Sequence, residues 1–300
     1  MEKTKFYIVD AFTDTAFKGN PAGIVLCSKS LTTDEMQNIA KELNLSETAF
    51  LYQAIDQHHH FDVKYFTPTN EVDFCGHATV GAAWIIATEL KYYPKYSELR
   101  LNTNIGIIPI EWQTKNELLS SVIMTQGVPD SKLIAESPAY LSSILGVKLE
   151  DIDNTYPIGL GFSGNWHLLI PIKTIAAINA SKPDLDELAI FNKKIGCITT
   201  HLYTFLDEKP SDYKIYTRDF APAIGIPEDP VTGSANGALC AFLIKQNILD
   251  PKVNHRFIIK QGNLMNREGY LSAEILKNGQ SFEIKIGGQA VLTMSGTINT

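Results

Sequence analysis

The chain has 300 residues, of which 44% are hydrophobic and 20% are charged, a composition typical of a globular protein long enough for two domains. Its net charge of -7 and its scattered Lys and Arg residues leave no basic face for phosphates, so we expect no nucleic-acid partner. No apolar run approaches the ~20 residues of a membrane span, and the N-terminus reads as a strand with interleaved charges. We therefore expect a soluble, cytoplasmic protein with no membrane partner.

In chain order, hydrophobic periodicity predicts a strand-rich first half. A Thr cap followed by helical spacing predicts a helix at 32–43, and an apolar run predicts a longer one at 76–90. Strands are expected at 5–12, 22–27, 48–53, 60–67 and 97–112. The polar stretch 113–117 then reads as a linker.

The second half repeats this mixture of elements. Strands are expected near 119–125, 166–172, 198–206, 213–220, 255–261 and 269–276, and helices near 138–146, 184–195 and 234–247. The helices at 76–90 and 234–247 are apolar on all sides, which indicates burial. We expect each half to wrap a sheet around one of them, with 1–117 plus 288–300 as the N-terminal half and 118–287 as the C-terminal half.

One short pattern occurs in both halves, as FCGHATVGAAW at 74–84 and DPVTGSANGAL at 229–239. Each copy follows a Phe-x-Pro segment and acidic residues, and leads through Gly-[His/Ser]-Ala into an apolar run. The acidic residues are Glu71, Asp73, Glu228 and Asp229. The repeat predicts two similar domains that face each other.

The start of each predicted helix is a potential anion site, because the first N–H groups of a helix lack intrahelical partners and lie at the positive end of its dipole. The residues concerned are Gly76, Ala78, Gly233 and Ala235. Two such sites facing one cleft would hold a small carboxylate, which is the substrate class that we expect.

Other apparent motifs do not fit their usual chemistry. Gly159, Gly161 and Gly164 match GxGxxG, but a strand follows where a dinucleotide site requires a helix. The run His58–His60 is poorly spaced for a metal, since neighbours on a strand point to opposite faces. The four cysteines form no CxxC pair and no disulfide framework. We expect no metal site.

Several residues remain as candidates for proton transfer. Glu47 lies in NLSETAF, between the first helix and an apolar strand, where partial desolvation would raise its pKa toward the range of a general acid or base. Alternatively, Glu47 caps or solvates a loop. His77 and Asp229 also have an alternative interpretation, in which they only cap or stabilise the start of a helix. In that case Ser234 is an ordinary residue of the first helical turn.

Five segments together resemble the phenazine-biosynthesis PhzF-like family, which has the diaminopimelate epimerase-like fold. They are NPAGIVL (20–26), NLSETAF (44–50), FTPTNEVDFCGHATVGAA (66–83), EDPVTGSANGAL (228–239) and QGNLMNREG (261–269). The resemblance implies an α+β protein with two pseudo-symmetric domains, each a curved, mostly antiparallel sheet around a central helix. It also implies an active site in the cleft between them, no cofactor and a homodimer.

Site residues follow from the matching motifs. The glutamate of N-L-S-E is Glu47, the implied proton shuttle, and the histidine of G-H is His77. The aspartate and serine of D-P-x-T-G-S are Asp229 and Ser234, which with His77 would orient the substrate and stabilise developing charge. Cys75 occupies the position of one of two opposed catalytic cysteines in related epimerases.

The mirror position of Cys75 is Thr232, whose hydroxyl has too high a pKa to serve as the partner base, so two-cysteine racemisation does not fit. We therefore expect a cofactor-independent isomerase that moves a proton on a small amino-acid-like or cyclic dienoic carboxylate. The alternatives are a racemase or epimerase that uses Glu47 with Cys75 or Asp229, and a binding or scaffold protein without turnover.

Overall fold

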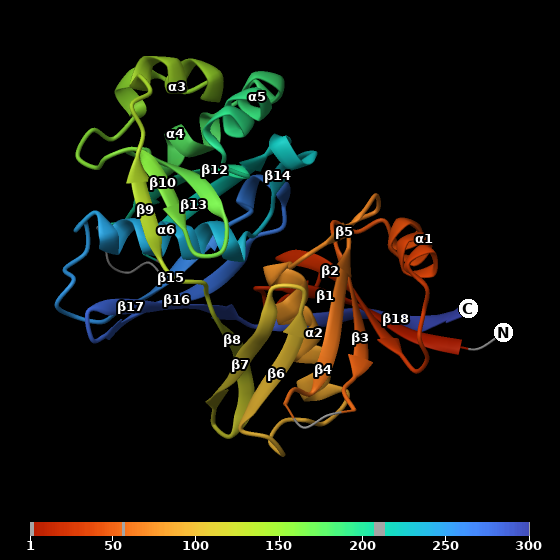
Figure 1. Cartoon of the computed structure of the whole chain (residues 1–300). Coiled ribbons are helices and arrows are strands. Elements are labelled where there is room, and N and C mark those ends of the chain that lie inside the picture. Colours follow the sequence, from red (N-terminus) through yellow and green to blue (C-terminus); the bar gives the residue numbers. More distant parts are fainter. Residues whose placement is uncertain (1–2, 56–57, 207–213, 300) are drawn as a thin grey trace. The chain divides into compact units, whose positions relative to one another are not determined.

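The computed structural model describes residues 3–55, 58–206 and 214–299, and these form two compact units (Figure 1). Unit 1 comprises residues 1–125 and 287–300, and unit 2 comprises residues 126–286. The stretch 113–117, expected to be a linker, instead holds the end of one strand and the turn of a hairpin inside unit 1. Asn116 and Glu117 both have positive φ there, 52° and 64°, as a tight hairpin turn requires.

The described residues of unit 1 form two helices, and about half of the unit lies in strands. The strands are β1 (Lys3–Ala11), β2 (Asn20–Cys27), β3 (Thr48–Gln53), β4 (Phe61–Phe66), β5 (Glu71–Val72), β6 (Glu98–Thr103), β7 (Gly106–Lys115), β8 (Leu118–Thr125) and β18 (Ala290–Asn299). The helices are α1 (Thr33–Leu43) and α2 (Gly76–Thr88). The expected strand at 97–112 is therefore two strands, β6 and β7, with Gly106 at φ 111° beginning the second.

Unit 2 has the same kind of sheet with more helices. Its strands are β9 (Asp130–Leu133), β10 (Gly159–Phe162), β11 (Trp166–Pro171), β12 (Thr199–Phe205), β13 (Ile215–Ala221), β14 (Ile226–Asp229), β15 (His255–Gln261) and β16 (Gly269–Asn278), and β17 (Ser281–Gly288) reaches the boundary. Its helices are α3 (Pro138–Leu145), α4 (Ile175–Ala180), α5 (Leu185–Ile195) and α6 (Gly233–Lys245), with 3-10 turns at Leu149–Asp151, Pro222–Ile224 and Asn263–Met265.

The two units share one topology. In unit 1, β1–β2 is antiparallel, β2–β3 parallel, β3–β4 antiparallel, β4–β6 parallel and β6–β7 antiparallel. In unit 2, β10–β11, β11–β12, β12–β13, β13–β15 and β15–β16 repeat this alternation in the same order. The short strand β5 pairs antiparallel with β4, and the short strand β14 pairs antiparallel with β13 in the same way. The internal repeat of the sequence thus reflects two units of the same construction.

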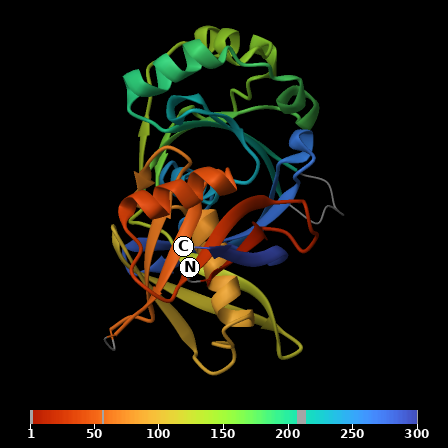
Figure 2. The same cartoon turned by 90° about the vertical axis from the view of Figure 1, so that its right-hand side faces the viewer.

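Each sheet curves around its central helix (Figures 1 and 2). Ten of the thirteen residues of α2 are buried, and so are eleven of the thirteen of α6, which explains why both sequences are apolar on every face. The predicted α+β, diaminopimelate epimerase-like fold is confirmed. No helix in the described part of the chain is long and apolar enough to cross a membrane.

Two glycines of the GxGxxG match, Gly159 and Gly161, serve packing. Gly159 and Gly161 lie on β10, which continues through a turn at Gly164 into the antiparallel strand β11. A Cβ on Gly161 would collide with the carbonyl oxygen of Ala238 on α6 and would lie 2.8 Å from Leu169 Cδ1. Gly159 and Gly161 let the central helix approach the strand closely. The strand expected after the motif, in place of the helix of a dinucleotide site, is β11.

Helices α3, α4 and α5 cover the outer face of the unit 2 sheet, on the side away from α6 (Figure 2). Their apolar side chains pack with those of β10 to β13 into a core of their own, which includes Leu141, Ile144, Leu188 and Phe191. In unit 1, α1 makes a smaller cluster with Phe50 and Phe66 through Met36, Ile39 and Ala40.

Candidate active site

Glu47 lies where the chain enters β3. Helix α1 ends at Asn44, whose left-handed conformation (φ 50°) turns the chain toward the sheet. The carbonyl oxygen of Glu47 then accepts a hydrogen bond of 3.1 Å from the N–H of Gly23, at the start of the parallel β2–β3 ladder. The backbone at Glu47 is therefore anchored to the sheet although it lies outside a strand.

The Glu47 side chain meets the start of α2. Its Oε2 lies 3.3 Å from His77 Nε2, and the Ser46 hydroxyl lies at the same distance from that nitrogen. Cys75 Sγ lies 3.4 Å from His77 Nδ1 and 3.9 Å from Nε2. Unit 1 thus brings together Ser46, Glu47, Cys75 and His77, three of which the sequence had singled out.

Burial controls the acidity of Glu47. Its side chain is 14% exposed, and desolvation of the carboxylate raises its pKa above the ordinary value, while hydrogen bonds from the Ser46 and Cys75 side chains act in the opposite direction. Desolvation is the larger effect, so burial in the structure raises the pKa of Glu47, as its position in the sequence had led us to expect.

Ligand atoms of Glu47, Cys75 and His77 all lie within 4.8 Å of one another, a donor set that zinc accepts. However, Cys75 Sγ is nearly equidistant from the two ring nitrogens of His77, so it faces the ring between them, and the lone pair of each nitrogen points elsewhere. One ion cannot bind the sulfur and either nitrogen unless the ring turns. In this arrangement His77 Nε2 contacts Glu47 and Ser46, while Cys75 Sγ lies against the His77 ring.

The start of α2 is fixed by hydrogen bonds to the sheet of unit 1. Cys75 is the N-cap residue, and its carbonyl oxygen accepts a hydrogen bond of 2.7 Å from Thr79 Oγ1. The hydroxyl of Thr79 in turn lies 2.6 Å from that of Tyr65, a fully buried residue of β4 whose pKa is raised by desolvation. This chain from the sheet to the helix start holds Cys75 and His77 in place.

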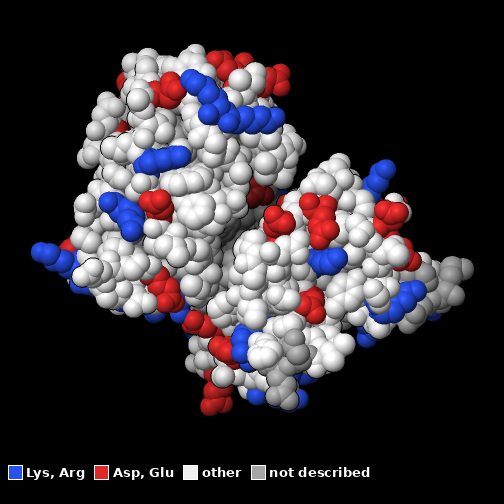
Figure 3. Space-filling view, viewed as in Figure 1, with Lys and Arg blue, Asp and Glu red and all other residues white. Residues whose placement is uncertain are grey.

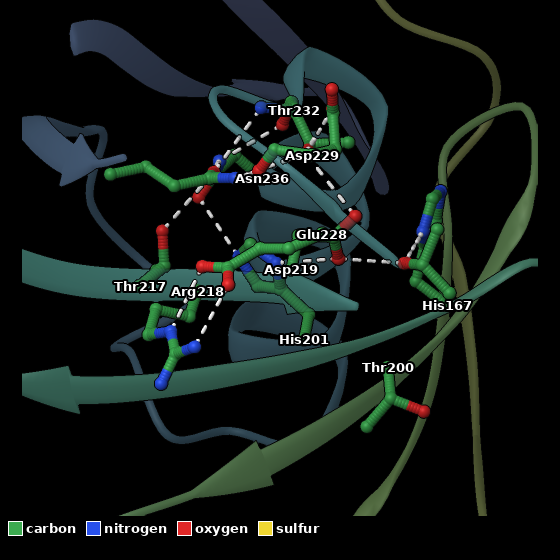
Figure 4. A network of polar contacts seen from close by, with 12 residues as sticks. His167, Thr200, His201, Thr217, Arg218, Asp219, Glu228, Asp229, Thr232 and Asn236 are labelled. Carbon is green, nitrogen blue, oxygen red and sulfur yellow. Dashed lines mark hydrogen bonds and ion pairs between the residues drawn. The ribbon is translucent and has the colours of Figure 1, made fainter. Parts of the chain in front are cut away.

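Asp229 ends β14 in unit 2 and precedes α6 (Figure 4). Its Oδ2 accepts a hydrogen bond of 2.5 Å from Thr232 Oγ1, the N-cap residue of α6. The same hydroxyl lies 3.2 Å from Oδ2 of Asp219, which is fully buried on β13. A single Thr232 hydroxyl therefore stands between two carboxylates.

A buried polar network continues behind Thr232. Gln261 at the end of β15 donates from Nε2 to the Asp229 carbonyl oxygen at 2.9 Å and to Thr232 Oγ1 at 3.0 Å. Asn236 on α6 donates to the Thr232 carbonyl oxygen and to Gln261 Oε1, both at 2.9 Å. Asn236 and Gln261 are fully buried, so these contacts fix the helix start rigidly.

His167, Thr199 and His201 complete the network on the far side of Asp219. Thr199 Oγ1 donates to Asp219 Oδ1 at 2.7 Å, and His201 Nδ1 lies 2.9 Å from the same oxygen. His167 Nδ1 lies 2.8 Å from Thr199 Oγ1, and burial lowers the pKa of His167 to about 4. Since the Thr199 proton is given to Asp219, the neutral His167 donates from Nδ1, which leaves its buried Nε2 without a partner.

Glu228 has a different role from its neighbour Asp229. The Arg218 guanidinium binds both carboxylate oxygens of Glu228, at 2.9 Å and 2.8 Å, and its remaining nitrogen donates to the carbonyl oxygens of Ile178 and Ser181. This acid of the repeat therefore connects β14 to α4. Its counterpart Glu71 contacts Asn104 at the surface.

Comparison of the units shows that their functional residues differ at matching positions. Strand register aligns Thr48, which pairs with Phe66, with Thr200, which pairs with Phe220. Glu47 therefore matches Thr199, so unit 2 has a hydroxyl where unit 1 has a carboxylate. By the same register Asp219 and Asp229 of unit 2 match Tyr65 and Val72 of unit 1.

The remaining predicted residues begin the central helices. Gly76 and Ala78 lie in the first turn of α2, and Gly233, Ser234 and Ala235 lie in that of α6. The carbonyl oxygen of Ser234 accepts a hydrogen bond of 3.4 Å from Ser163 Oγ. Anion binding at these two helix starts stays a prediction, as does the proposal that one ligand uses both.

Sequence reasoning missed Ser46 and the network around Asp219. Ser46 adjoins Glu47 in the N-L-S-E segment, and Gln261 begins the QGNLMNREG segment, so both lay inside motifs already noted. His167, Thr199 and His201 carry no local motif. They become neighbours of Asp219 only when β11, β12 and β13 pair. Because the sequence alone does not reveal this register, sequence reasoning could not identify them.

On the face shown in Figure 3, Lys and Arg side chains alternate with Asp and Glu and with uncharged surface. The described residues form no continuous basic area on that face. The charged groups seen there are those of an ordinary mixed surface.

Comparisons with known proteins agree with this description. Residues 9–296 match the family model described as phenazine biosynthesis-like protein. An uncharacterized isomerase from Clostridium acetobutylicum is 36% identical over 99% of both chains, and the trans-2,3-dihydro-3-hydroxyanthranilate isomerase of Pseudomonas chlororaphis is 28% identical over 98% of both. The crystal structure of a PhzF-family phenazine biosynthesis protein from Bacillus anthracis covers 100% of both chains with a TM-score of 0.89 and 29% identity.

The fold and these relatives define an enzyme of the isomerase class. The chain belongs to the phenazine biosynthesis-like, PhzF-like family, as the five sequence segments had indicated.

Proposed function

We propose that this chain is a cofactor-independent isomerase that moves a proton between carbon atoms of a small carboxylate-bearing substrate through Glu47. The observation that carries the proposal is the environment of Glu47, a largely buried carboxylate with raised pKa beside Ser46, Cys75 and His77. A pKa closer to the working pH lets one group both accept and donate a proton efficiently.

In the proposed reaction, ionised Glu47 removes a proton from one carbon and the resulting acid returns it to another. No electrons are gained or lost, so the step needs no oxidant or reductant. His77, 3.3 Å from the carboxylate, stabilises charge that develops during the transfer. We assign Asp229 and Ser234 to orienting the substrate, and the N–H groups at the starts of α2 and α6 to its carboxylate.

The proposed substrate class is a cyclic dienoic or amino-acid-like carboxylate. It follows from the relative that is named trans-2,3-dihydro-3-hydroxyanthranilate isomerase and is similar to this chain over nearly its whole length. That compound carries the carboxylate and the ring double bonds that proton movement requires. We propose it as the first probe substrate.

A second candidate function is racemisation or epimerisation assisted by Cys75, which lies within hydrogen-bonding distance of His77. In unit 2 the position that matches Cys75 is Thr232, whose proton is donated to Asp229. A threonine hydroxyl does not ionise in the working range, so it cannot return a proton as an opposed base. The asymmetry favours the isomerase, in which a single glutamate handles the proton.

Turnover of the probe substrate by three variants tests the assignment. We expect Glu47→Gln, which keeps the shape but cannot transfer a proton, to lower kcat by about 10²-fold to 10⁴-fold. Asp229→Asn should also be severely impaired, whereas Cys75→Ala should lose far less. Glu42→Gln, a change of the same kind on the exposed face of α1, is the matched control. Conversion is followed by proton NMR.

Two outcomes would change the assignment. Wild-type turnover in Glu47→Gln would remove Glu47 from the mechanism. A folded Cys75→Ala protein as impaired as Glu47→Gln would favour the cysteine-dependent epimerase. If wild-type protein binds the probe but converts none of it, nor any other cyclic or amino-acid carboxylate tested, the binding-protein alternative is supported.

A further inference from the structure

Asn236 determines the protonation of His201. The two Nδ2 protons of Asn236 point to the Thr232 carbonyl oxygen and to Gln261 Oε1. Gln261 is itself fixed, because its Nε2 donates to the Asp229 carbonyl oxygen and its Oε1 receives the N–H of Thr232 at 3.2 Å. Asn236 therefore presents its oxygen to His201 Nε2, 3.2 Å away, so this nitrogen must carry a proton.

The other ring nitrogen of His201 faces a carboxylate. Nδ1 lies 2.9 Å from Asp219 Oδ1, which can only accept when ionised. Both ring nitrogens of His201 therefore carry a proton, and His201 is an imidazolium paired with Asp219. Both side chains are fully buried, where a charge requires an opposite charge and hydrogen bonds.

The groups around this pair allow one positive charge. His167 on β11 is neutral, and it adjoins Asp219 through Thr199. Arg218 is the next residue of β13, but its side chain points to the opposite face and binds Glu228. His201 contacts Asp219 directly, and Asp219 is connected to Asp229 through Thr232.

Thr232 connects this pair to Asp229. A hydroxyl has one proton, and Thr232 Oγ1 is within reach of both carboxylates, at 2.5 Å from Asp229 and 3.2 Å from Asp219. Asp219 already receives protons from Thr199 and His201, so it does not need the one from Thr232. Without His201, Asp219 would lose a donor and its counter-charge, and would compete for that proton.

We propose that His201 is a positioning residue, a buried imidazolium that satisfies Asp219 so that the Thr232 hydroxyl stays committed to Asp229 and fixes the orientation of its carboxylate. The protonation of His201 follows from the hydrogen bonds alone. Its importance for turnover rests on the proposed role of Asp229.

Nitrogen-15 NMR of the full-length protein with labelled histidine tests the protonation of His201 without an activity assay. Among the seven histidines, we expect one whose two ring nitrogens both show the protonated chemical shift at neutral pH, assigned to His201 by sequential correlation and by its loss in His201→Gln. A His201 spectrum typical of a neutral tautomer would overturn the proposal, whether or not the protein is active.

Steady-state kinetics on the probe substrate tests the second part. A misoriented catalytic group costs up to about 10²-fold, so we expect folded His201→Gln to lose about tenfold to 10²-fold in kcat with little change in KM. Thr232→Val, which removes only the connecting hydroxyl, should show the same split and serves if His201→Gln does not fold. The control is His255→Gln, because the ring of His255 lies at the surface, where it contacts the Asp250 carbonyl oxygen. Variants with the kcat of this control would overturn the positioning role.

Discussion

Glu47 carries a cost in stability that follows from its proposed role. Desolvation raises its pKa in the folded state, so folding favours the protonated carboxyl. Between the ordinary pKa of a glutamate and the higher folded value, the native protein binds more protons than the unfolded chain. The free energy of unfolding that Glu47 contributes is therefore highest at acidic pH, and is lost as pH rises through the folded pKa.

Comparing wild type with Glu47→Gln across pH tests this. The glutamine does not titrate, so we expect the variant to gain stability relative to wild type as pH rises from about 4 to about 8. Urea unfolding at each pH measures the difference, with Glu42→Gln as the exposed control. A difference that stays constant, or that changes in the opposite direction, would contradict the assignment of a raised pKa.

At the residue level, the sequence singled out those residues of the two polar clusters that lie in motifs, and their roles in a reaction stay predictions. Glu47, His77 and Asp229 were singled out because each belongs to a short recognisable segment. His201 and Asp219 were not, since their partnership depends on the β12–β13 register, and Thr199 matches Glu47 only through the pairing of strands. Local patterns identify residues that begin helices, but not those that support them from neighbouring strands.

At the level of elements, the central helices were the most predictable part. Their all-round apolar sequences and glycine starts placed α2 and α6 within two residues of the observed bounds. The short strands β5, β9, β10 and β14 were not predicted, because two to four residues carry too little periodicity. The amphipathic helix α1 was recognised from a Thr cap followed by helical spacing, and the structure shows that Thr32 forms a capping box with Glu35.

Close packing of a central helix against its sheet gives a prediction at this scale. Gly161→Ala would place a Cβ against the Ala238 carbonyl of α6, and we expect a loss of ~1–3 kcal/mol in the free energy of unfolding from overpacking.

The matched control is Gly81→Ala, inside α2. Its added Cβ would lie 3.5 Å from Ile24 Cδ1 and Val9 Cβ, which is ordinary contact, and alanine favours the helix by up to ~1 kcal/mol. Thermal or denaturant unfolding compares the two. If both substitutions have equal effects, close approach of α6 to β10 is not what requires Gly161.

At the scale of the whole molecule, duplication explains both what the units share and how they differ. Two copies of one topology supply two buried helices with similar starts, yet only unit 1 has a carboxylate at the entrance to its third strand, and only unit 2 has the Asp219 and Asp229 pair. A symmetric pair of bases would suit racemisation. The observed asymmetry suits a reaction in which one group moves the proton and others hold the substrate.

The expected division into halves came from the repeat and the resemblance, and the structure ends the first segment of unit 1 after Thr125. The hairpin of β7 and β8 accounts for the difference from residue 117, since a polar turn and a polar linker look alike in sequence. The homodimer and the cytoplasmic location implied by the resemblance and composition stay predictions.

Solvent deuterium incorporation tests the central claim most directly. When trans-2,3-dihydro-3-hydroxyanthranilate, the proposed probe substrate, is incubated with wild-type protein in D₂O, we predict a product with deuterium at the carbon that receives the proton, because the Glu47 carboxyl that has taken up the substrate proton exchanges it with solvent before it returns a proton to the other carbon. Glu47→Gln should show neither product nor exchange, while Glu42→Gln behaves as wild type. Deuterium incorporation by Glu47→Gln at the wild-type rate would contradict proton transfer through Glu47.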